Sequence, residues 1–179
     1  QQKTIDVGMA GTAFRFLTSY YSIKEGEVVL TGDERMKQRP IAALVEALLE
    51  LGADINYLEK KGFPPLHIKG KELHGGRVSI TSDVSSQFIS SLLLIAPKLK
   101  NGLQLQLKNT QLSRPYTEMT LSILEQLEFS VNSSYDFIDV KAGKANKSQI
   151  RVESDWSSAA FFYNALLVYD GELQLFLEG

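Results

Sequence analysis

The chain has 179 residues, of which 44% are hydrophobic and 22% are charged, a composition typical of a folded globular protein. Lys and Arg number 19 against 21 for Asp and Glu, and the formal net charge of −2 argues against a nucleic-acid partner, since proteins that bind nucleic acids are usually basic. The absence of cysteine excludes disulfides and thiolate metal sites, and the two histidines, His67 and His74, have no metal-ligand partner at a useful spacing.

The sequence contains no membrane anchor or leader of a recognisable kind. Its apolar runs are far shorter than the roughly 20 residues that a membrane-spanning helix needs, and no signal peptide opens the chain. We therefore expect a cytoplasmic protein with no membrane partner. The chain begins at Gln1 without a methionine and ends at Gly179 directly after a strand-like run, which indicates a piece of a longer enzyme.

Helix and strand patterns alternate along the chain. Residues 11–22 have the apolar spacing of a helix, and residues 27–30 form a short strand-like run. A second helix is predicted over residues 40–51, with Pro40 at its start and Gly52 as its C-terminal cap. The remaining predicted helices are residues 84–96, 115–127 and 156–167. The remaining predicted strands are residues 54–58, 66–69, 77–81, 103–107, 129–132, 137–141, 149–153 and 172–176.

The order of these elements repeats. Small or hydroxylic pairs occur at three predicted helix starts, namely Gly11-Thr12, Ser85-Ser86 and Ser157-Ser158. The interval from Thr12 to Ser85 is 73 positions and that from Ser85 to Ser157 is 72. We therefore predict an α/β (α+β) fold with a pseudo-threefold repeat of β/α units in a single domain over residues 1–179. The repeats cover approximately residues 11–81 and 82–153, with an incomplete third at 154–179.

The repeated helix starts are candidate anion sites. The first N–H groups of a helix have no partner within the helix, and they attract anions. Ser85, Ser86 and Gln87 add hydroxyl and amide donors at the second start. In the next loop Ser113 and Tyr116 stand just before and within another predicted helix. Ordinary N-capping explains such residues equally well.

Basic residues gather near these helix starts. Arg15 lies one turn into the first helix, and the loop at residues 32–40 contains Arg35, Lys37 and Arg39. A guanidinium group suits bidentate binding of phosphate or carboxylate, although acidic residues in the same loop also permit a plain solvated surface. The glycines form neither a GxGxxG nor a Walker pattern, which argues against nucleotide binding of those kinds.

Four separated motifs together resemble the EPSP synthase family, the 3-phosphoshikimate 1-carboxyvinyltransferases. They are AGTAFR at residues 10–15, LTGDERMKQRP at 30–40, VSSQF at 84–88 and SRPY at 113–116. The similarity extends to ESDWSSAA at residues 153–160 and so covers nearly the whole chain. Two positions depart from the usual pattern: Met9 stands where many members have Asn, and Phe16 where many have Pro.

The resemblance implies a fold and a reaction. Family members have two lobes, each an inside-out α/β arrangement of three repeats with helices inside and sheets outside, and the active site lies between them. This chain would be most of the lobe formed by the N-terminal half, with the second lobe of the same enzyme as its partner. The reaction implied is transfer of the enolpyruvyl group of phosphoenolpyruvate to shikimate 3-phosphate, in aromatic amino acid biosynthesis, without cofactor or metal. The family is also the target of the herbicide glyphosate.

The resemblance also assigns site residues. Shikimate 3-phosphate would be held by Ser85, Ser86, Gln87, Ser113 and Tyr116. Phosphoenolpyruvate would be held by Gly11, Arg15, Arg35 and Gln87. None of the catalytic acid or base residues falls in this piece, so the isolated chain should be inactive. The alternatives are the related UDP-N-acetylglucosamine enolpyruvyltransferase and a noncatalytic anion-binding module.

Overall fold

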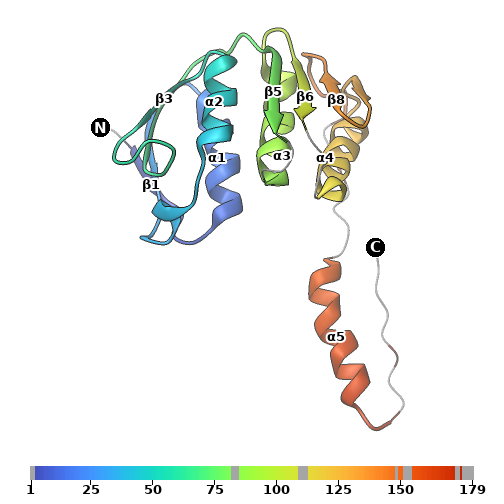
Figure 1. Cartoon of the computed structure of the whole chain (residues 1–179). Coiled ribbons are helices and arrows are strands. Elements are labelled where there is room, and N and C mark those ends of the chain that lie inside the picture. Colours follow the sequence, from blue (N-terminus) through green and yellow to red (C-terminus); the bar gives the residue numbers. More distant parts are fainter. Residues whose placement is uncertain are drawn as a thin grey trace. The chain divides into compact units, whose positions relative to one another are not determined.

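The computed structural model in Figure 1 describes residues 3–81, 85–108, 113–147, 149–150, 155–171 and 174. The chain divides into two compact units, Gln1–Ser148 and Gln149–Gly179. The first unit contains two four-stranded sheets with their helices, and the second contains helix α5 (Trp156–Val168). No helix in the described part of the chain has the length and apolar character needed to cross a membrane.

Two successive repeats build the first unit. The first consists of β1 (Lys3–Asp6), α1 (Gly11–Ile23), β2 (Gly26–Thr31), the 3-10 helix η1 (Met36–Gln38), α2 (Ala42–Glu50), β3 (Asp54–Tyr57) and β4 (Leu66–Gly70). The second consists of β5 (Gly76–Thr81), α3 (Ser86–Ile95), the 3-10 helix η2 (Ala96–Lys98), β6 (Leu103–Lys108), α4 (Arg114–Gln126), β7 (Val131–Ser133) and β8 (Phe137–Val140).

The two sheets have the same topology. Their strand orders are β1-β2-β4-β3 and β5-β6-β8-β7. In each sheet the first pair of strands is parallel and the other two pairs are antiparallel. The β/α repeat predicted from the spacing of the helix starts is therefore confirmed for these two repeats, and the structure adds that the directions of their strand pairs agree.

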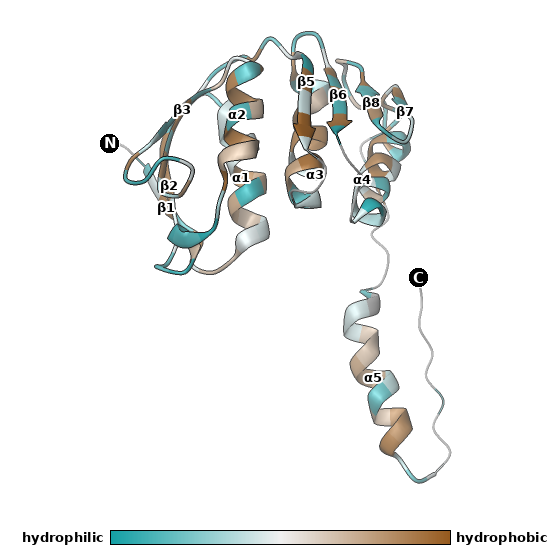
Figure 2. Ribbon diagram, in the orientation of Figure 1, coloured by the Kyte–Doolittle hydropathy of each residue, from teal (hydrophilic) through white to brown (hydrophobic). Residues whose placement is uncertain are grey.

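The sheets lie outside and the helices pack between them (Figure 1). In β6, Leu103, Leu105 and Leu107 are buried while the two glutamines between them are half-buried, the period-two pattern of a sheet with one face on a core. Figure 2 shows both kinds of residue along β6, hydrophobic in brown and hydrophilic in teal. Each sheet thus has an apolar face toward the helices and a more polar outer face.

Small hydroxylic residues line the contacts between the helices. Thr18, Ser19 and Ser22 on α1 are fully buried, as are Ser90 and Ser91 on α3 to within a few per cent. The hydroxyl groups bond within their own helices or across to the next, for example from Thr18 Oγ1 to the Phe14 carbonyl at 2.8 Å. Their small size lets the helices approach closely while every one of these hydrogen bonds remains inside the protein.

The sequence missed some element boundaries. Strand β1 was not predicted, because its four residues are mostly exposed and carry no apolar alternation. Helix α2 begins at Ala42 rather than at Pro40, since Ile41, at φ −132°, is the residue that precedes the helix. Gly52 follows α2 with a φ of +98°, as its predicted capping role requires.

Pairing of β5 with β6 places the start of the second repeat at Gly76, ahead of the expected position 82. Of the strand predicted at residues 149–153, Gln149 and Ile150 adopt no regular structure and the other three lie outside the described residues. The strand predicted at 172–176 also lies outside them, apart from Gln174. The last predicted helix is present as α5, one residue longer than expected.

Candidate functional site

Four of the predicted site residues, namely Ser86, Gln87, Tyr116 and Arg35, line two hollows of the first unit. One hollow, of about 470 Å³, is lined by Thr12, Phe16, Ser86, Gln87, Ser90, Tyr116, Met119 and Thr120. The other, of about 460 Å³, is lined by Met9, Asp33, Arg35, Met36 and Arg39. We call the first the hydroxyl pocket and the second the arginine pocket.

The hydroxyl pocket lies at the N-terminal turns of three helices. Thr12 is the second residue of α1, Ser86 and Gln87 open α3, and Tyr116 is in the first turn of α4. The structure therefore brings together three predicted residues from two loops that are about 30 positions apart in the sequence. The N-terminal ends of α1, α3 and α4 each contribute unpaired N–H groups and a partial positive charge near this hollow.

Ser85 and Ser113 occupy equivalent positions but behave differently. Both are the residues that precede a helix, α3 and α4 respectively. The Ser85 hydroxyl oxygen accepts from the Gln87 backbone N–H at 3.3 Å, which is ordinary capping. The Ser113 side chain makes no capping hydrogen bond. The capping interpretation thus fits Ser85, whereas the hydroxyl of Ser113 is available for another partner.

Gln87 is held from the first repeat. Its side-chain Nε2 donates a hydrogen bond to Thr12 Oγ1 at 2.9 Å. The two residues are 75 positions apart, close to the interval of the repeat. The side chain of a predicted ligand-binding residue is therefore oriented by a residue of α1.

Two guanidinium groups meet at the start of α1. Arg15 is only 6% exposed, and its Nε and Nη1 atoms are buried without a hydrogen-bond partner in the described part of the chain. Gly11 is buried beneath them, and a Cβ added there would overlap the side chains of both Arg39 and Arg15. A side chain at position 11 would therefore displace the guanidinium ends of these two arginines from their present places.

The electrostatics of this pair favour an anion. Burial lowers the pKa of the Arg15 guanidinium, and the positive charge of Arg39 lowers that pKa further. The Arg15 guanidinium carbon also lies 5.7 Å from the centre of the Phe88 ring. Unpaired buried donors and a second cation nearby both destabilise the charged side chain, and a bound phosphate or carboxylate would relieve both effects.

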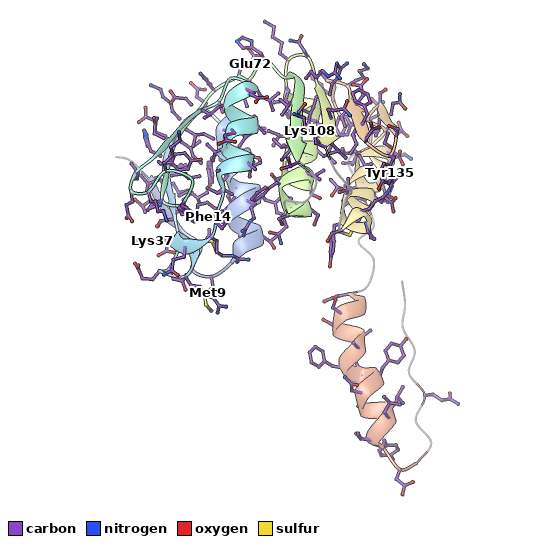
Figure 3. All side chains as sticks on the ribbon, in the orientation of Figure 1. Met9, Phe14, Lys37, Glu72, Lys108 and Tyr135 are labelled. Atoms are coloured by element: carbon purple, nitrogen blue, oxygen red, sulfur yellow. The ribbon has the colours of Figure 1, made fainter. Side chains whose placement is uncertain are left out.

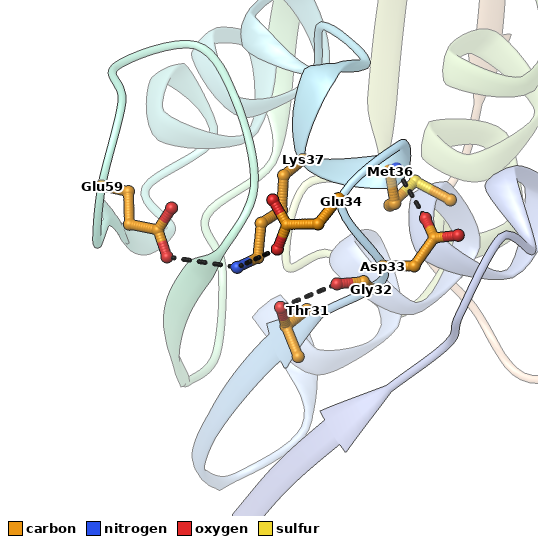
Figure 4. Close-up of polar contacts among 7 residues, drawn as sticks. All are labelled: Thr31, Gly32, Asp33, Glu34, Met36, Lys37 and Glu59. Carbon is orange, nitrogen blue, oxygen red and sulfur yellow. Dashed lines mark hydrogen bonds and ion pairs between the residues drawn. The ribbon is translucent and has the colours of Figure 1, made fainter.

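The loop between β2 and α2 contains three cationic side chains, Arg35, Lys37 and Arg39, of which Lys37 is neutralised by carboxylates. Lys37 Nζ lies 3.2 Å from a Glu34 carboxylate oxygen and 3.5 Å from one of Glu59, as Figure 4 shows. The Asp33 carboxylate accepts from the Met36 backbone N–H at 2.8 Å. Among the described residues, no carboxylate forms an ion pair with Arg35 or Arg39. The solvated-loop alternative therefore holds for Lys37.

The arginine pocket adjoins the start of α1. Figure 3 shows Met9 and Lys37 at the same end of the first repeat, with Phe14 buried between α1 and the sheet. Met9, one of the two departures from the family pattern, is 68% exposed and lines this pocket, and Phe16, the other departure, lines the hydroxyl pocket. Both unusual positions thus border a hollow.

Sequence reasoning missed two residues of this site, Arg39 and Thr12. Both had been noticed, Arg39 as a loop cation and Thr12 as a helix start, but neither was assigned a role. The recurring Arg-Pro dipeptides, Arg39-Pro40 and Arg114-Pro115, were the available signal for the first. The contact between Thr12 and Gln87 depends on how α1 packs against α3. In the sequence, only the spacing of the repeats indicates it.

The described residues offer no metal site. No group of three or more His, Asp or Glu side chains among them could hold an ion. His67 lies on β4 with its Nε2 3.6 Å from a Glu27 carboxylate oxygen, and His74 stands in the turn before β5.

The chain is similar to known proteins over nearly its whole length. The family model described as EPSP synthase (3-phosphoshikimate 1-carboxyvinyltransferase) matches residues 1–176. A 3-phosphoshikimate 1-carboxyvinyltransferase of Bacteroides fragilis is 48% identical over 162 residues, covering 90% of this chain and 40% of the relative. One of Shewanella pealeana is 40% identical over 178 residues, covering 98% of this chain and 42% of the relative.

The solved structures give the same result for the fold. The EPSP synthase of Acinetobacter baumannii superposes with a TM-score of 0.73 at 29% sequence identity, covering 89% of this chain and 35% of that one. The chain therefore spans about two fifths of the length of the curated relatives that it matches.

Proposed function

Because the chain belongs to the EPSP synthase family, we propose that it is a substrate-binding part of an enzyme that transfers the enolpyruvyl group of phosphoenolpyruvate to shikimate 3-phosphate. The bond formed joins the 5-hydroxyl oxygen of shikimate 3-phosphate to the enolpyruvyl carbon. The bond broken releases phosphate from that carbon. The products are 5-enolpyruvylshikimate 3-phosphate and phosphate, in a cytoplasmic pathway to aromatic amino acids.

The observation that carries this proposal is the pair of guanidinium groups over Gly11. Arg15 has buried N–H donors without a partner in the described structure, and Arg39 shares the same space. Phosphoenolpyruvate carries a phosphate and a carboxylate, the two groups that a guanidinium fork binds best. We assign Gly11, Arg15 and Arg39 to this substrate, with Arg35 at the edge of the adjoining arginine pocket.

We assign shikimate 3-phosphate to the hydroxyl pocket. Ser86, Gln87 and Tyr116 line it, and they supply two hydroxyl groups and one amide. Ser85 and Ser113 precede the two helices whose first turns form the pocket. A phosphate placed at these turns would accept from backbone N–H groups and from serine hydroxyls together. Gln87 is bonded to Thr12 of α1, and the family resemblance assigns it to both substrates.

Proton transfer in this reaction has no obvious agent among these residues. Addition and elimination each move a proton, which requires an acid or base near the reacting carbon. The assigned residues are cations, hydroxyls and one amide. We therefore propose that the chain binds both substrates and that the catalytic acid and base belong to a second lobe of the same enzyme, so that the 179-residue chain alone releases no phosphate.

The test is a titration of amide chemical shifts of the whole 179-residue chain with millimolar shikimate 3-phosphate. We expect shifts at Ser85, Ser86, Gln87 and Ser113. UDP-N-acetylglucosamine is the control ligand, because the related enolpyruvyltransferase uses it. Response to the control alone would contradict the proposed substrate. Response to any phosphate monoester with equal affinity would instead favour a noncatalytic anion-binding module.

A further inference from the structure

The side chains of Thr12 and Gln87 form a contact between the two repeats at the edge of the hydroxyl pocket. Each is the second residue of its helix, Thr12 in α1 and Gln87 in α3. The Gln87 Nε2 donates to Thr12 Oγ1 at 2.9 Å, and both residues line the same hollow. The hydrogen bond therefore lies where a ligand in this pocket would meet the Gln87 amide.

The direction of this hydrogen bond determines which atom of the Gln87 amide remains available to a ligand. A primary amide has two N–H donors on its nitrogen and one carbonyl oxygen that accepts. When one N–H of Gln87 is given to Thr12, the nitrogen is fixed toward α1 and the carbonyl oxygen remains free to accept from a ligand hydroxyl. Because the threonine oxygen accepts this bond, its own proton remains available to donate as well.

We propose that Thr12 is a positioning residue that fixes the Gln87 amide so that its carbonyl oxygen accepts a hydroxyl of the bound sugar-like substrate. This inference rests on the proposed function for the identity of that substrate, shikimate 3-phosphate. Thr12 acts through Gln87. Without the Thr12 hydroxyl, the Gln87 side chain is free to move and must be ordered when the substrate binds. Ordering a free side chain costs affinity even when every contact of the ligand is preserved.

Thr12 has little part in holding the helices together. It is exposed, and α1 is joined to α3 by buried contacts elsewhere, including the hydrogen bond between Ser19 and Ser91. Replacement of Thr12 by valine keeps the branched shape and removes only the hydroxyl. The fold should therefore survive this substitution, and a binding defect would report the hydrogen bond.

The first experiment needs no ligand. The side-chain NH₂ signals of Gln87 are followed by ¹⁵N relaxation in the wild-type chain, Thr12→Val and Thr12→Ser. We expect a restricted amide in the wild type and in Thr12→Ser, and a mobile one in Thr12→Val. Equal mobility in all three proteins would overturn the proposal. Thr4→Val, which removes an exposed hydroxyl from β1, is the matched control.

The second experiment measures binding of shikimate 3-phosphate by the same proteins. We expect Thr12→Val to weaken binding about fivefold, the cost of ordering one side chain on binding, and Thr12→Ser to restore it. Binding of inorganic phosphate should stay unchanged. If the wild type binds shikimate 3-phosphate and Thr12→Val binds it equally well, the positioning role is wrong and the proposed function stands. If the wild type does not bind it, the proposed substrate is wrong, and the relaxation data still decide whether Thr12 fixes Gln87.

Discussion

The hydroxyl groups of Ser19 and Ser91 share a hydrogen bond of 2.9 Å in the interior, between α1 and α3. The two residues belong to different repeats, Ser19 being the ninth residue of α1 and Ser91 the sixth of α3. Hydroxyl groups of the two repeats thus meet across the helix interface. Serine suits this position because it is small enough for close helix packing. Its hydroxyl group also forms a hydrogen bond with the facing hydroxyl.

Removal of either hydroxyl alone should lower the free energy of unfolding by more than half of the amount that is lost when both are removed. In Ser19→Ala the buried hydroxyl of Ser91 keeps only its 3.2 Å bond to the Phe88 carbonyl. We expect a loss of about 1 to 2 kcal/mol in the free energy of unfolding. In Ser19→Ala/Ser91→Ala no hydroxyl is stranded, so the combined loss should fall short of the sum of the single losses. Urea denaturation of the four proteins measures this, and strict additivity would contradict the coupling.

Gly11→Ala should weaken binding of phosphoenolpyruvate. The new Cβ would occupy the space of the Arg15 and Arg39 side chains, which then must move apart. We expect a loss of at least about tenfold in affinity, equal to about 1.4 kcal/mol. Gly143→Ala is the control, because nothing lies within 4 Å of a Cβ added there. Isothermal titration calorimetry gives both affinities, and equal values would count against the site.

Arg39→Met should make the protein less sensitive to phosphate. In the wild type, phosphate bound between Arg15 and Arg39 stabilises the folded chain and raises Tm by mass action. Burial is the larger cause of the lowered Arg15 pKa and persists in this variant, but loss of Arg39 removes the smaller cause, so that pKa should rise in part. The matched control is Lys37→Met, because Glu34 and Glu59 already neutralise this lysine. Thermal unfolding with and without 10 mM phosphate, about the concentration needed for a weak site, distinguishes the two variants. A shift in Arg39→Met as large as that of the wild type would refute the assignment.

The start of α5 should lose order in acid. Asp155 accepts from the Ser158 hydroxyl at 2.6 Å and from the Ser157 backbone N–H at 2.9 Å. The Ser158 hydrogen bond, above all, lowers the pKa of Asp155 below its usual value of 3.8. The ionised carboxylate therefore stabilises the helix fully above that usual value, and the stabilisation disappears as the pH falls through the lower, folded value.

Backbone amide signals of residues 156–159, recorded between pH 6 and pH 2, test this expectation. They should change in the wild type as the carboxylate gains a proton. In Asp155→Asn the cap persists without an ionisable group, so the same signals should stay constant with pH. Asp170→Asn controls for loss of a charge elsewhere in the second unit. A pH dependence that Asp155→Asn retains would assign the effect to another group.

The repeat could be predicted because similar residues recur along the sequence at a regular interval. Hydroxylic pairs at the helix starts recur at nearly constant intervals, and α1 and α3 begin at those pairs. Strand β1 was invisible for the opposite reason, since a four-residue edge strand with exposed side chains has no pattern to detect.

The choice among the loop arginines could not be made from the sequence. Arg35 and Arg39 flank the 3-10 helix η1, whose first residue, Met36, is buried. The direction in which each side chain leaves this turn depends on how Met36 packs, and the turn carries Arg39 to Gly11. A motif places both arginines near the site, but only three-dimensional packing separates their positions.

Strand pairing within the first unit never crosses from one repeat to the other. Every hydrogen-bonded strand pair in the described residues joins strands of the same sheet, and each sheet is made from one continuous stretch, 3–70 or 76–140. A chain cut in the five-residue turn between β4 and β5 would keep both sheets whole. The two pieces would reassociate through their helices and through this segment, because Leu73 is buried and its carbonyl accepts from the Lys100 backbone N–H. Fragment complementation would therefore report how well the two repeats recognise each other.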